Sequence, residues 1–162
     1  MTDISKYKNV SLAKDTYLNL DKIRKVITPH IVQSRSGTIN ILVNSIERAL
    51  GFQTKVLETT VVYADPDVAV LRGYGSEWMM HADHTYSEHP LKKNLGKKPA
   101  RGIGIELRLH GCNPDVAQAK ALALGEVVLA EAADKAHGVR EAYIIDPDGY
   151  TWVPDIPLAE VV

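Results

Sequence analysis

The sequence predicts an α+β protein in which two βαβββ modules form a curved mixed sheet around a cavity. The main observation is that one order of strand-like and helix-like segments occurs twice along the 162 residues. A second observation is that short strand-like runs, separated by turn residues, close each copy. Because neither copy alone can bury both a sheet face and a helix stripe, we expect the two copies to share one core.

The first copy begins with a β-rich run, Val26–Gln33. Apolar residues at helical spacing over residues 39–50 then predict a helix, which Thr38 or Ser36 can cap and Gly51 can end. Three strand-like runs complete this copy: Thr54–Tyr63, Val68–Arg72 and Glu77–Ala82.

The second copy begins with the strand-like run Gly104–His110. A helix is expected next, with Asn113 as its N-cap, Pro114 at its first position and Gly125 after its end. Its apolar stripe should consist of Val116, Ala119, Leu122 and Leu124. The closing strands are predicted at Val127–Ala130, Glu141–Ile145 and Tyr150–Val153.

The two copies divide the chain into four parts. These are a polar N-terminal arm (1–25), the first module (26–90), a basic linker loop (91–102) and the second module (103–162). The cations of the linker stand among glycine and proline residues and are Lys92, Lys93, Lys97, Lys98 and Arg101. Such a charge run is typical of a solvated connecting loop.

Composition restricts the classes of partner. The net charge of −1 gives no overall electrostatic footprint for nucleic acid. The single cysteine, Cys112, excludes an internal disulfide and fits a reducing compartment. No apolar run approaches the roughly 20 residues that span a bilayer, and the N-terminus lacks a signal-peptide pattern. We therefore expect a cytoplasmic protein without a membrane or nucleic-acid partner.

Strand alternation places polar residues on one shared face. Glu106 and Arg108 lie opposite the apolar residues of their strand, and His30 has the same relation to its own strand. Met79 and His81 should likewise face away from the core, although a one-residue shift of that strand would exchange His81 for Met80. These side chains would then converge on one cavity.

The sequence allows two interpretations of this cavity. His30, His81 and Glu106 have the composition of a 2-His-1-carboxylate site, which suits Fe(II), Mn(II) or Zn(II). Alternatively, Glu106 pairs with Arg108, and the two histidines form hydrogen bonds in a metal-free cavity. Aromatic residues such as Tyr63 could stack a planar ligand there. The candidate ligand-binding residues are His30, Tyr63, Met79, His81, Glu106 and Arg108.

Other polar clusters favour plainer roles. His84 and His89 follow His81 closely, but on a strand His81 and His84 face opposite sides, so we expect surface loop histidines. Asp146 and Asp148 lie in a tight turn, where aspartate commonly bonds the backbone.

Several segments resemble the vicinal oxygen chelate superfamily of glyoxalases, bleomycin resistance proteins and extradiol dioxygenases. Glu141–Trp152 resembles its closing DPDGY-x-W hairpin, and Thr28–Val32 resembles its opening strand. Ala49–Phe52 resembles the end of its first helix, and Met79–Asp83 the end of a third strand. The resemblance covers roughly residues 26–157.

The resemblance implies a four-residue metal site. Its positions fall at His30 (or Thr28), at or next to His81, at Glu106 and at Val153, which cannot bind a metal. It therefore favours a protein that binds a small organic ligand, such as an antibiotic or another natural product, with no cofactor. The alternative is a dioxygenase, lyase, isomerase or thiol transferase that holds Fe, Mn, Zn or Ni. The resemblance also implies a homodimer.

Overall fold

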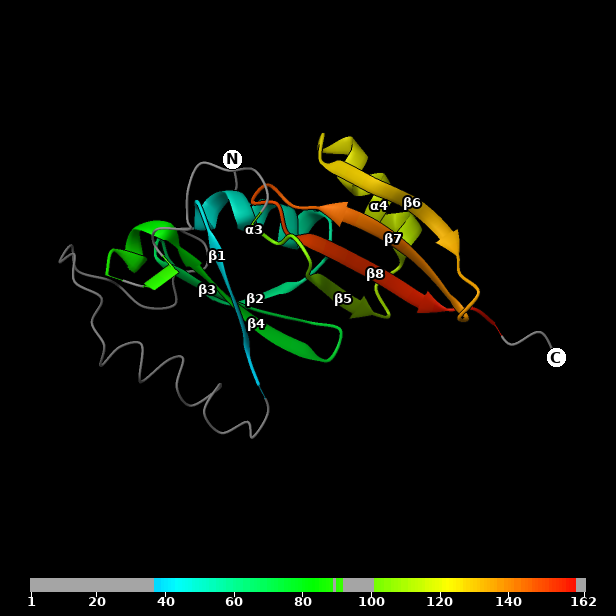
Figure 1. Ribbon diagram of the computed structural model, residues 1–162, viewed down its shortest axis with the longest axis horizontal. Helices are drawn as coiled ribbons and strands as arrows, with labels where there is room; N and C mark the ends of the chain where they lie inside the picture. Colours follow the sequence, from blue (N-terminus) through cyan, green and yellow to red (C-terminus); the bar gives the residue numbers. More distant parts are fainter. Residues whose placement is uncertain (1–36, 89, 92–100, 160–162) are drawn as a thin grey trace.

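The computed structural model describes residues 37–88, 90–91 and 101–159 (Figure 1). The first module contains β1 (Ile39–Val43), α3 (Ile46–Lys55), β2 (Thr60–Ala64), β3 (Val68–Gly73), β4 (Ser76–Ala82) and a short 3-10 helix (Asp83–Tyr86). The second contains β5 (Glu106–His110), α4 (Pro114–Ala123), β6 (Val127–Asp134), β7 (Val139–Ile145) and β8 (Thr151–Pro157). No helix among these elements is long and apolar enough to cross a membrane.

The two sheets have the same topology, which confirms the predicted α+β fold of two βαβββ modules. Their strand orders are β1-β4-β3-β2 and β5-β8-β7-β6. In each sheet the first strand of the module runs parallel to the last, and the other pairs are antiparallel. Figure 1 shows the sheets side by side, cyan to green for the first and yellow to red for the second.

The prediction of a helix over residues 39–50 was wrong for the first part of that range. Residues 39–43, expected in a helix, form strand β1, and α3 begins only after Ser45, whose Oγ accepts a hydrogen bond from the Arg48 N–H at 3.5 Å. The helix then continues through Gly51 to Lys55. The apolar residues over 39–50 fit both the period of a helix and the period of a strand. Ile41 and Val43, two residues apart, lie on the same face of β1 and are buried in the core.

Strand β4, which carries Met79 and His81, lies next to β1 in the first sheet. The strand beside β4 is β1, in which Asn40 pairs with Met79 and Leu42 with His81. Val26–Gln33, and with it His30, lies outside the described residues, as do the arm 1–25 and linker residues 92–100.

The second module follows its prediction more closely, but the buried side of its helix was predicted wrongly. The Asn113 Oδ1 accepts hydrogen bonds from the N–H groups of Asp115 (3.0 Å) and Val116 (3.1 Å), as expected of an N-cap. However, α4 buries Pro114, Ala117 and Ala121, whereas Val116, Ala119, Leu122 and Leu124 of the predicted stripe are exposed. The small buried side chains let the helix lie close to β6 and β7.

One apolar core joins the modules. Its buried residues come from both halves of the chain, and the rings of Trp78 and Trp152 meet across it with centroids 5.5 Å apart. Strand β3 is buried on both faces, because Ala69 and Leu71 belong to this core while Val68 and Val70 form a second cluster on the opposite face.

A turn of the second module docks onto the first. Within the turn, Asp146 accepts hydrogen bonds from the N–H groups of Asp148 (2.9 Å) and Tyr150 (3.0 Å), as the sequence predicts for such a turn. The Tyr150 hydroxyl accepts a bond from the Leu42 N–H (3.2 Å) and donates to the Leu42 carbonyl (3.0 Å). Asp148 Oδ1 accepts bonds from the Asn44 N–H and from Arg48, both at 2.8 Å.

Arg101 reinforces this junction. Its guanidinium donates to both carboxylate oxygens of Asp83 at 2.6 Å and to the Leu42 carbonyl at 3.0 Å. Its side chain is only 12% exposed, so the expectation that Arg101 belongs to a solvated loop was wrong. The ion pair fixes the beginning of the second module against the end of β4.

We predict that Tyr150→Phe destabilises the whole protein. The substitution removes the hydroxyl that bonds both backbone groups of Leu42; the buried N–H loses this partner, while the carbonyl keeps its bond from Arg101. The expected loss is about 1–3 kcal/mol in the free energy of unfolding, measured in urea. As a control, Tyr86→Phe removes a hydroxyl that bonds an exposed side chain and should cost within about 0.5 kcal/mol. Equal losses in the two variants would contradict the role of the docked turn.

Candidate functional site

The sheet of the first module carries an apolar face that points away from α3. We call it the module-one face, and its residues are Val62, Tyr63, Val68, Val70, Met79 and His81. His81 pairs with Val68 and Met79 with Val70, and directly paired residues share a face. Three of the six sequence-predicted ligand residues, Tyr63, Met79 and His81, therefore come together here.

The register of β4 agrees with the prediction. Met80 is fully buried in the core beside α3, so His81 points to the opposite side. On that side, burial raises the pKa of Tyr63, and a hydrogen bond from its hydroxyl to Asp65 Oδ2 (2.5 Å) raises it further. Tyr63 thus remains a neutral phenol at physiological pH.

A hydrogen-bonded chain fixes the His81 ring. Asn40 Oδ1 lies 2.8 Å from His81 Nδ1, and the Asn40 amide donates to the Tyr86 hydroxyl at 2.8 Å. The Tyr86 ring stands edge-on to the imidazole with centroids 5.5 Å apart. With a carbonyl oxygen beside it, Nδ1 carries the proton, and Nε2 is then a hydrogen-bond acceptor.

Burial lowers the pKa of His81, and the opposing influence of Asp65 and Asp67 does not restore it. The imidazole is therefore neutral at physiological pH. A neutral ring with an acceptor nitrogen, set beside an apolar sheet face, can bind a donor group of a ligand without introducing a charge.

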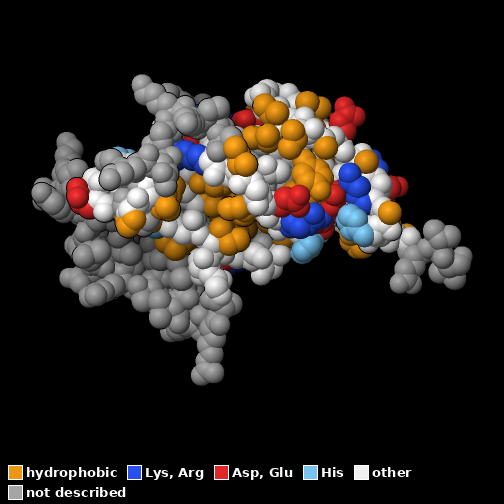
Figure 2. All heavy atoms as spheres, viewed as in Figure 1, with side chains coloured by type: hydrophobic (Ala, Val, Ile, Leu, Met, Phe, Trp, Pro, Cys, Tyr) orange, Lys and Arg blue, Asp and Glu red, His pale blue; other side chains and the backbone are white. Residues whose placement is uncertain are grey.

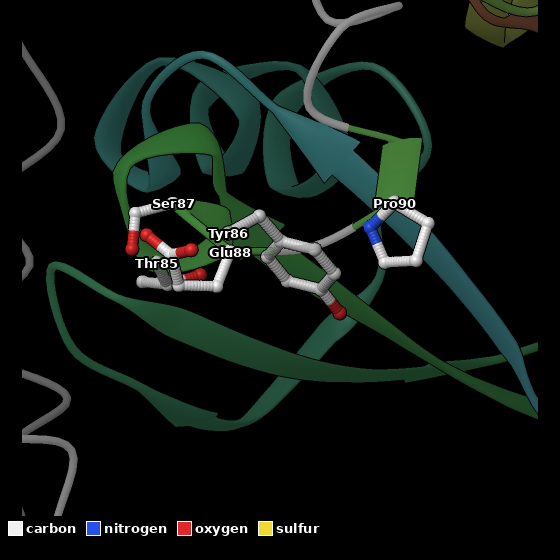
Figure 3. Close-up of a pocket in the computed structure, with 5 residues that line it drawn as sticks. All are labelled: Thr85, Tyr86, Ser87, Glu88 and Pro90. Carbon is white, nitrogen blue, oxygen red and sulfur yellow. The ribbon is translucent and has the colours of Figure 1, made fainter.

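Tyr86 connects this chain to an open pocket. The pocket has a volume of about 500 Å³ and is lined by Thr85, Tyr86, Ser87, Glu88 and Pro90. Figure 3 shows the Tyr86 ring reaching across the strands toward Pro90, with the smaller polar side chains at its other end. The pocket thus adds hydroxyl and carboxylate groups next to the His81–Asn40–Tyr86 chain.

The second module carries a polar face of different character. Arg108 Nη1 donates to Glu106 Oε2 at 3.1 Å, so the predicted pairing of these residues is confirmed. Arg108 Nη2 also donates to Asp155 Oδ2 at 3.1 Å and to Glu141. The guanidinium therefore holds three carboxylates, which come from β5, β7 and β8. Its hydrogen bonds, first of all the one to Glu141, raise the pKa of Arg108.

Two of these carboxylates are buried, with side-chain exposures of 2% for Glu141 and 3% for Asp155. Burial raises the pKa of Glu141, but hydrogen bonds from Arg108 and Tyr143 outweigh it, and the pKa lies below its ordinary value. His110 Nδ1 lies 2.8 Å from Asp155 Oδ1. Figure 2 shows acidic, basic and histidine side chains gathered on this face, beside a hydrophobic area over β6.

The sequence interpretation missed Glu141 and Asp155. The predicted last strand ended at Val153, yet β8 continues through Pro154 and brings Asp155 to the face of Arg108. Extending the alternation from Val153 to Asp155 would have found it, since residues two apart share a face. Glu141 was inside a predicted strand, but no face was assigned to it.

The described residues do not fit the metal site that the resemblance implies. His81 is bonded to Asn40, and Glu106 is bonded to Arg108. Val153 is buried and pairs with Arg108. Within residues 37–88, 90–91 and 101–159, no three His, Cys, Asp or Glu side chains are grouped so that they could hold a metal ion. The contribution of His30 stays a prediction.

We predict that the imidazole of His81 remains neutral at a pH where ordinary histidines are protonated. The pKa of His81 is lower in the folded protein than in the unfolded chain, so protonation favours the unfolded state. The protein should therefore lose stability through His81 as the pH falls below about 6.5, the ordinary pKa of histidine. An NMR titration of the ring, assigned with His81→Gln, measures the midpoint. A midpoint above 6.5 would contradict the burial argument, and His81→Gln should weaken the acid dependence of unfolding.

The fold has known relatives. A glyoxalase-related enzyme from Fulvimarina pelagi matches with a TM-score of 0.60 and 16% identity, covering 76% of this chain and 88% of that one. A glyoxalase/bleomycin resistance protein/dioxygenase family enzyme from Burkholderia phytofirmans PsJN matches with a TM-score of 0.61 and 15% identity, over 75% and 97% of the two chains. A glyoxalase/bleomycin resistance protein/dioxygenase from Nocardioides gives 0.57 and 19%, over 86% and 95%.

The sequence itself matches no protein-family model and no curated protein. At identities this low, structural likeness establishes a shared fold and leaves activity open. It confirms, at the level of the fold, the resemblance seen in the sequence. The chain has the fold of the glyoxalase, bleomycin resistance and dioxygenase proteins.

Proposed function

We propose that this protein binds a small organic molecule on the module-one face without the metal site that the family resemblance implies. The observation that carries the proposal is that this sheet has two apolar faces. One packs against α3 in the core, and the other presents Tyr63 and Met79, which are only partly buried. A partly buried apolar face beside fixed polar groups is typical of a small-molecule site.

The polar groups define the class of ligand. The apolar face favours a planar or aromatic body, which can lie against Tyr63 and the thioether of Met79. Neutral His81 offers an acceptor nitrogen, so the favoured ligand carries a hydroxyl or N–H donor. The proposed ligand is therefore an uncharged aromatic compound with one donor group, a description that many natural products meet.

The alternative function, a metal-dependent enzyme, can be tested separately. It needs His30 beside His81 and Glu106, and His30 lies outside the described residues. Elemental analysis of protein purified without chelator or nickel resin separates the two functions. Stoichiometric Fe, Mn, Zn or Ni that is lost in His30→Ala would support a dioxygenase, lyase, isomerase or thiol transferase instead.

We also propose that two copies associate along β6. This strand is at the edge of its sheet, and Val127 and Leu129 are 56% and 60% exposed. Leu122 and Leu124, which precede it, are exposed as well. An exposed apolar edge strand is a natural place for pairing, and two identical strands can pair about a twofold axis.

We predict that the protein binds 2-naphthol more tightly than 2-methoxynaphthalene, which lacks the donor. One hydrogen bond to His81 is worth about 0.5–1.5 kcal/mol, so the expected ratio of dissociation constants is roughly 2- to 10-fold. Met79→Glu should abolish binding of both compounds, because it places a carboxylate on the apolar face. His81→Phe should keep binding and remove the preference. The measurement is titration of ligand fluorescence.

The matched control is Ala119→Glu, which adds the same carboxylate to the exposed side of α4. It should bind both compounds as the wild type does. Equal loss in Met79→Glu and Ala119→Glu, or full binding in Met79→Glu, would remove the module-one face as the site. Titration with bleomycin, measured in the same way, tests whether this protein binds the antibiotic after which some of its fold relatives are named.

The association of two copies along β6 can be tested by mutation. Leu129→Lys places a charge in the apolar edge and should shift the protein from dimer to monomer, as measured by light scattering after gel filtration. Thr60→Lys, on an exposed position of β2 in the other sheet, should leave the dimer intact. A monomeric wild type would contradict the assembly proposal while leaving the ligand proposal standing.

A further inference from the structure

We propose that Asn40 determines which ligands the module-one face accepts, because it holds the proton of His81 on Nδ1 and thereby leaves Nε2 as a hydrogen-bond acceptor. This role rests on the proposed function, since it concerns the choice of ligand at the same face. Asn40 acts through the imidazole of His81 and is therefore a positioning residue.

Asn40 lies on β1, directly beside the strand that carries His81. Its Oδ1 is 2.8 Å from His81 Nδ1, and the residue itself is paired with Met79 in the β1–β4 ladder. Because paired residues share a face, the Asn40 side chain lies on the same side of the sheet as Met79 and His81. Among the residues that the structure describes, no other hydrogen bond reaches the His81 ring. The proton position of the imidazole therefore depends on Asn40.

Tyr86 fixes which end of the Asn40 amide faces the imidazole. The amide has an oxygen acceptor at one end and an N–H₂ donor at the other, and its Nδ2 donates to the Tyr86 hydroxyl at 2.8 Å. That bond leaves Oδ1 to face His81, and a carbonyl oxygen can only accept a hydrogen bond. The protonated nitrogen of the imidazole is thus Nδ1, and Nε2 keeps its lone pair.

The charges around His81 leave the imidazole with a single proton. Asp65 and Asp67 favour the charged form, but burial has the larger effect and lowers the pKa of His81. Both carboxylates also have other partners, because Asp65 accepts a hydrogen bond from Tyr63 and Asp67 lies 2.6 Å from His84 Nε2. With one proton on the ring, the amide beside it decides which nitrogen carries that proton.

A fixed acceptor selects ligands by the kind of polar group that they carry. A hydroxyl or N–H donor on the ligand satisfies Nε2, whereas a carbonyl or carboxylate would bring a second lone pair against it. A polar group left unpaired on an apolar face costs binding free energy. The module-one face should therefore exclude anions and ligands that have only acceptors, even when their aromatic body fits against Met79 and Val70.

Replacing the Asn40 amide by a carboxylate should remove this preference. In Asn40→Asp the opposite charge beside Nδ1 raises the pKa of His81, and the imidazolium then donates from both nitrogens. Wild type should bind 2-naphthol roughly 2- to 10-fold more tightly than 2-acetylnaphthalene, which has an acceptor and no donor. In Asn40→Asp at about pH 6, close to the ordinary pKa of histidine, that ratio should fall to about one or below.

A second variant separates the hydrogen bond from the charge. Asn40→Leu keeps the size of the side chain and removes its bonds to His81 and Tyr86, so either nitrogen of the imidazole can carry the proton. The ratio of the two dissociation constants should again approach one. Asn40 is exposed, so neither substitution should prevent folding. A full wild-type preference in Asn40→Leu would overturn the role of Asn40.

The proton position can be measured without any ligand. Long-range ¹H–¹⁵N NMR correlation separates a protonated ring nitrogen from an unprotonated one, and wild-type His81 should carry its proton on Nδ1. Tyr86→Phe should populate both neutral forms of the ring. A wild-type proton on Nε2 would refute the role of Asn40 even if 2-naphthol binds. Failure of both compounds to bind protein with the Nδ1 proton would instead overturn the proposed ligand site, and with it the effect of Asn40 on ligand choice.

The matched control is Thr38→Asp, which adds the same charge at an exposed position two residues before Asn40. Its carboxylate lies roughly 7 Å further along the chain, too far to contact His81 Nδ1. The NMR signature and the ratio of dissociation constants should therefore match those of the wild type. A ratio that falls equally in Thr38→Asp and Asn40→Asp would show that charge alone sets the preference, and it would refute the contact with Asn40 as the determinant.

Discussion

The docking of the turn 146–150 onto the β1–α3 junction is the contact on which the arrangement of the modules depends. Tyr150 satisfies both backbone groups of Leu42, and Asp148 binds the Asn44 N–H together with the Arg48 side chain at the start of α3. A carboxylate at this end of a helix also complements the helix dipole. This short turn thus contacts the end of β1 and the start of α3, and it links the second module to the first.

The candidate site depends on the same contact. Leu42 pairs with His81 across β1 and β4, and Asn40, two residues earlier on β1, holds the His81 ring. If β1 moved relative to β4, Asn40 would lose both His81 and Tyr86. The hydrogen-bond acceptor offered by His81 is therefore set by a turn whose own residues come from the other module.

Sequence alone predicted the repeat, the second module and the side of His81, because each rests on local signals. Asn113 and Pro114 specify a helix start, and alternation along β4 separates Met80 from His81. Its errors in the bounds of strands arise where tertiary contacts, and not the local pattern, decide the structure. The apolar residues of 39–50 fit a strand or a helix, and pairing with β4 decides that the first of them form a strand. Strand β8 likewise continues beyond Val153, because it pairs with β5 and β7 there.

The two sheets show how one topology supports two kinds of surface. Corresponding strands have the same order, yet the face of β3 and β4 carries valine and methionine, while that of β7 and β8 carries Glu141 and Asp155. Backbone pairing sets which residues share a face but not their chemistry. The apolar face can admit a ligand without breaking an ion pair, whereas entry to the polar face would require Arg108 to leave two buried carboxylates. This difference in cost favours the first sheet as the place for the proposed ligand, whereas the second sheet uses its charges to balance one another.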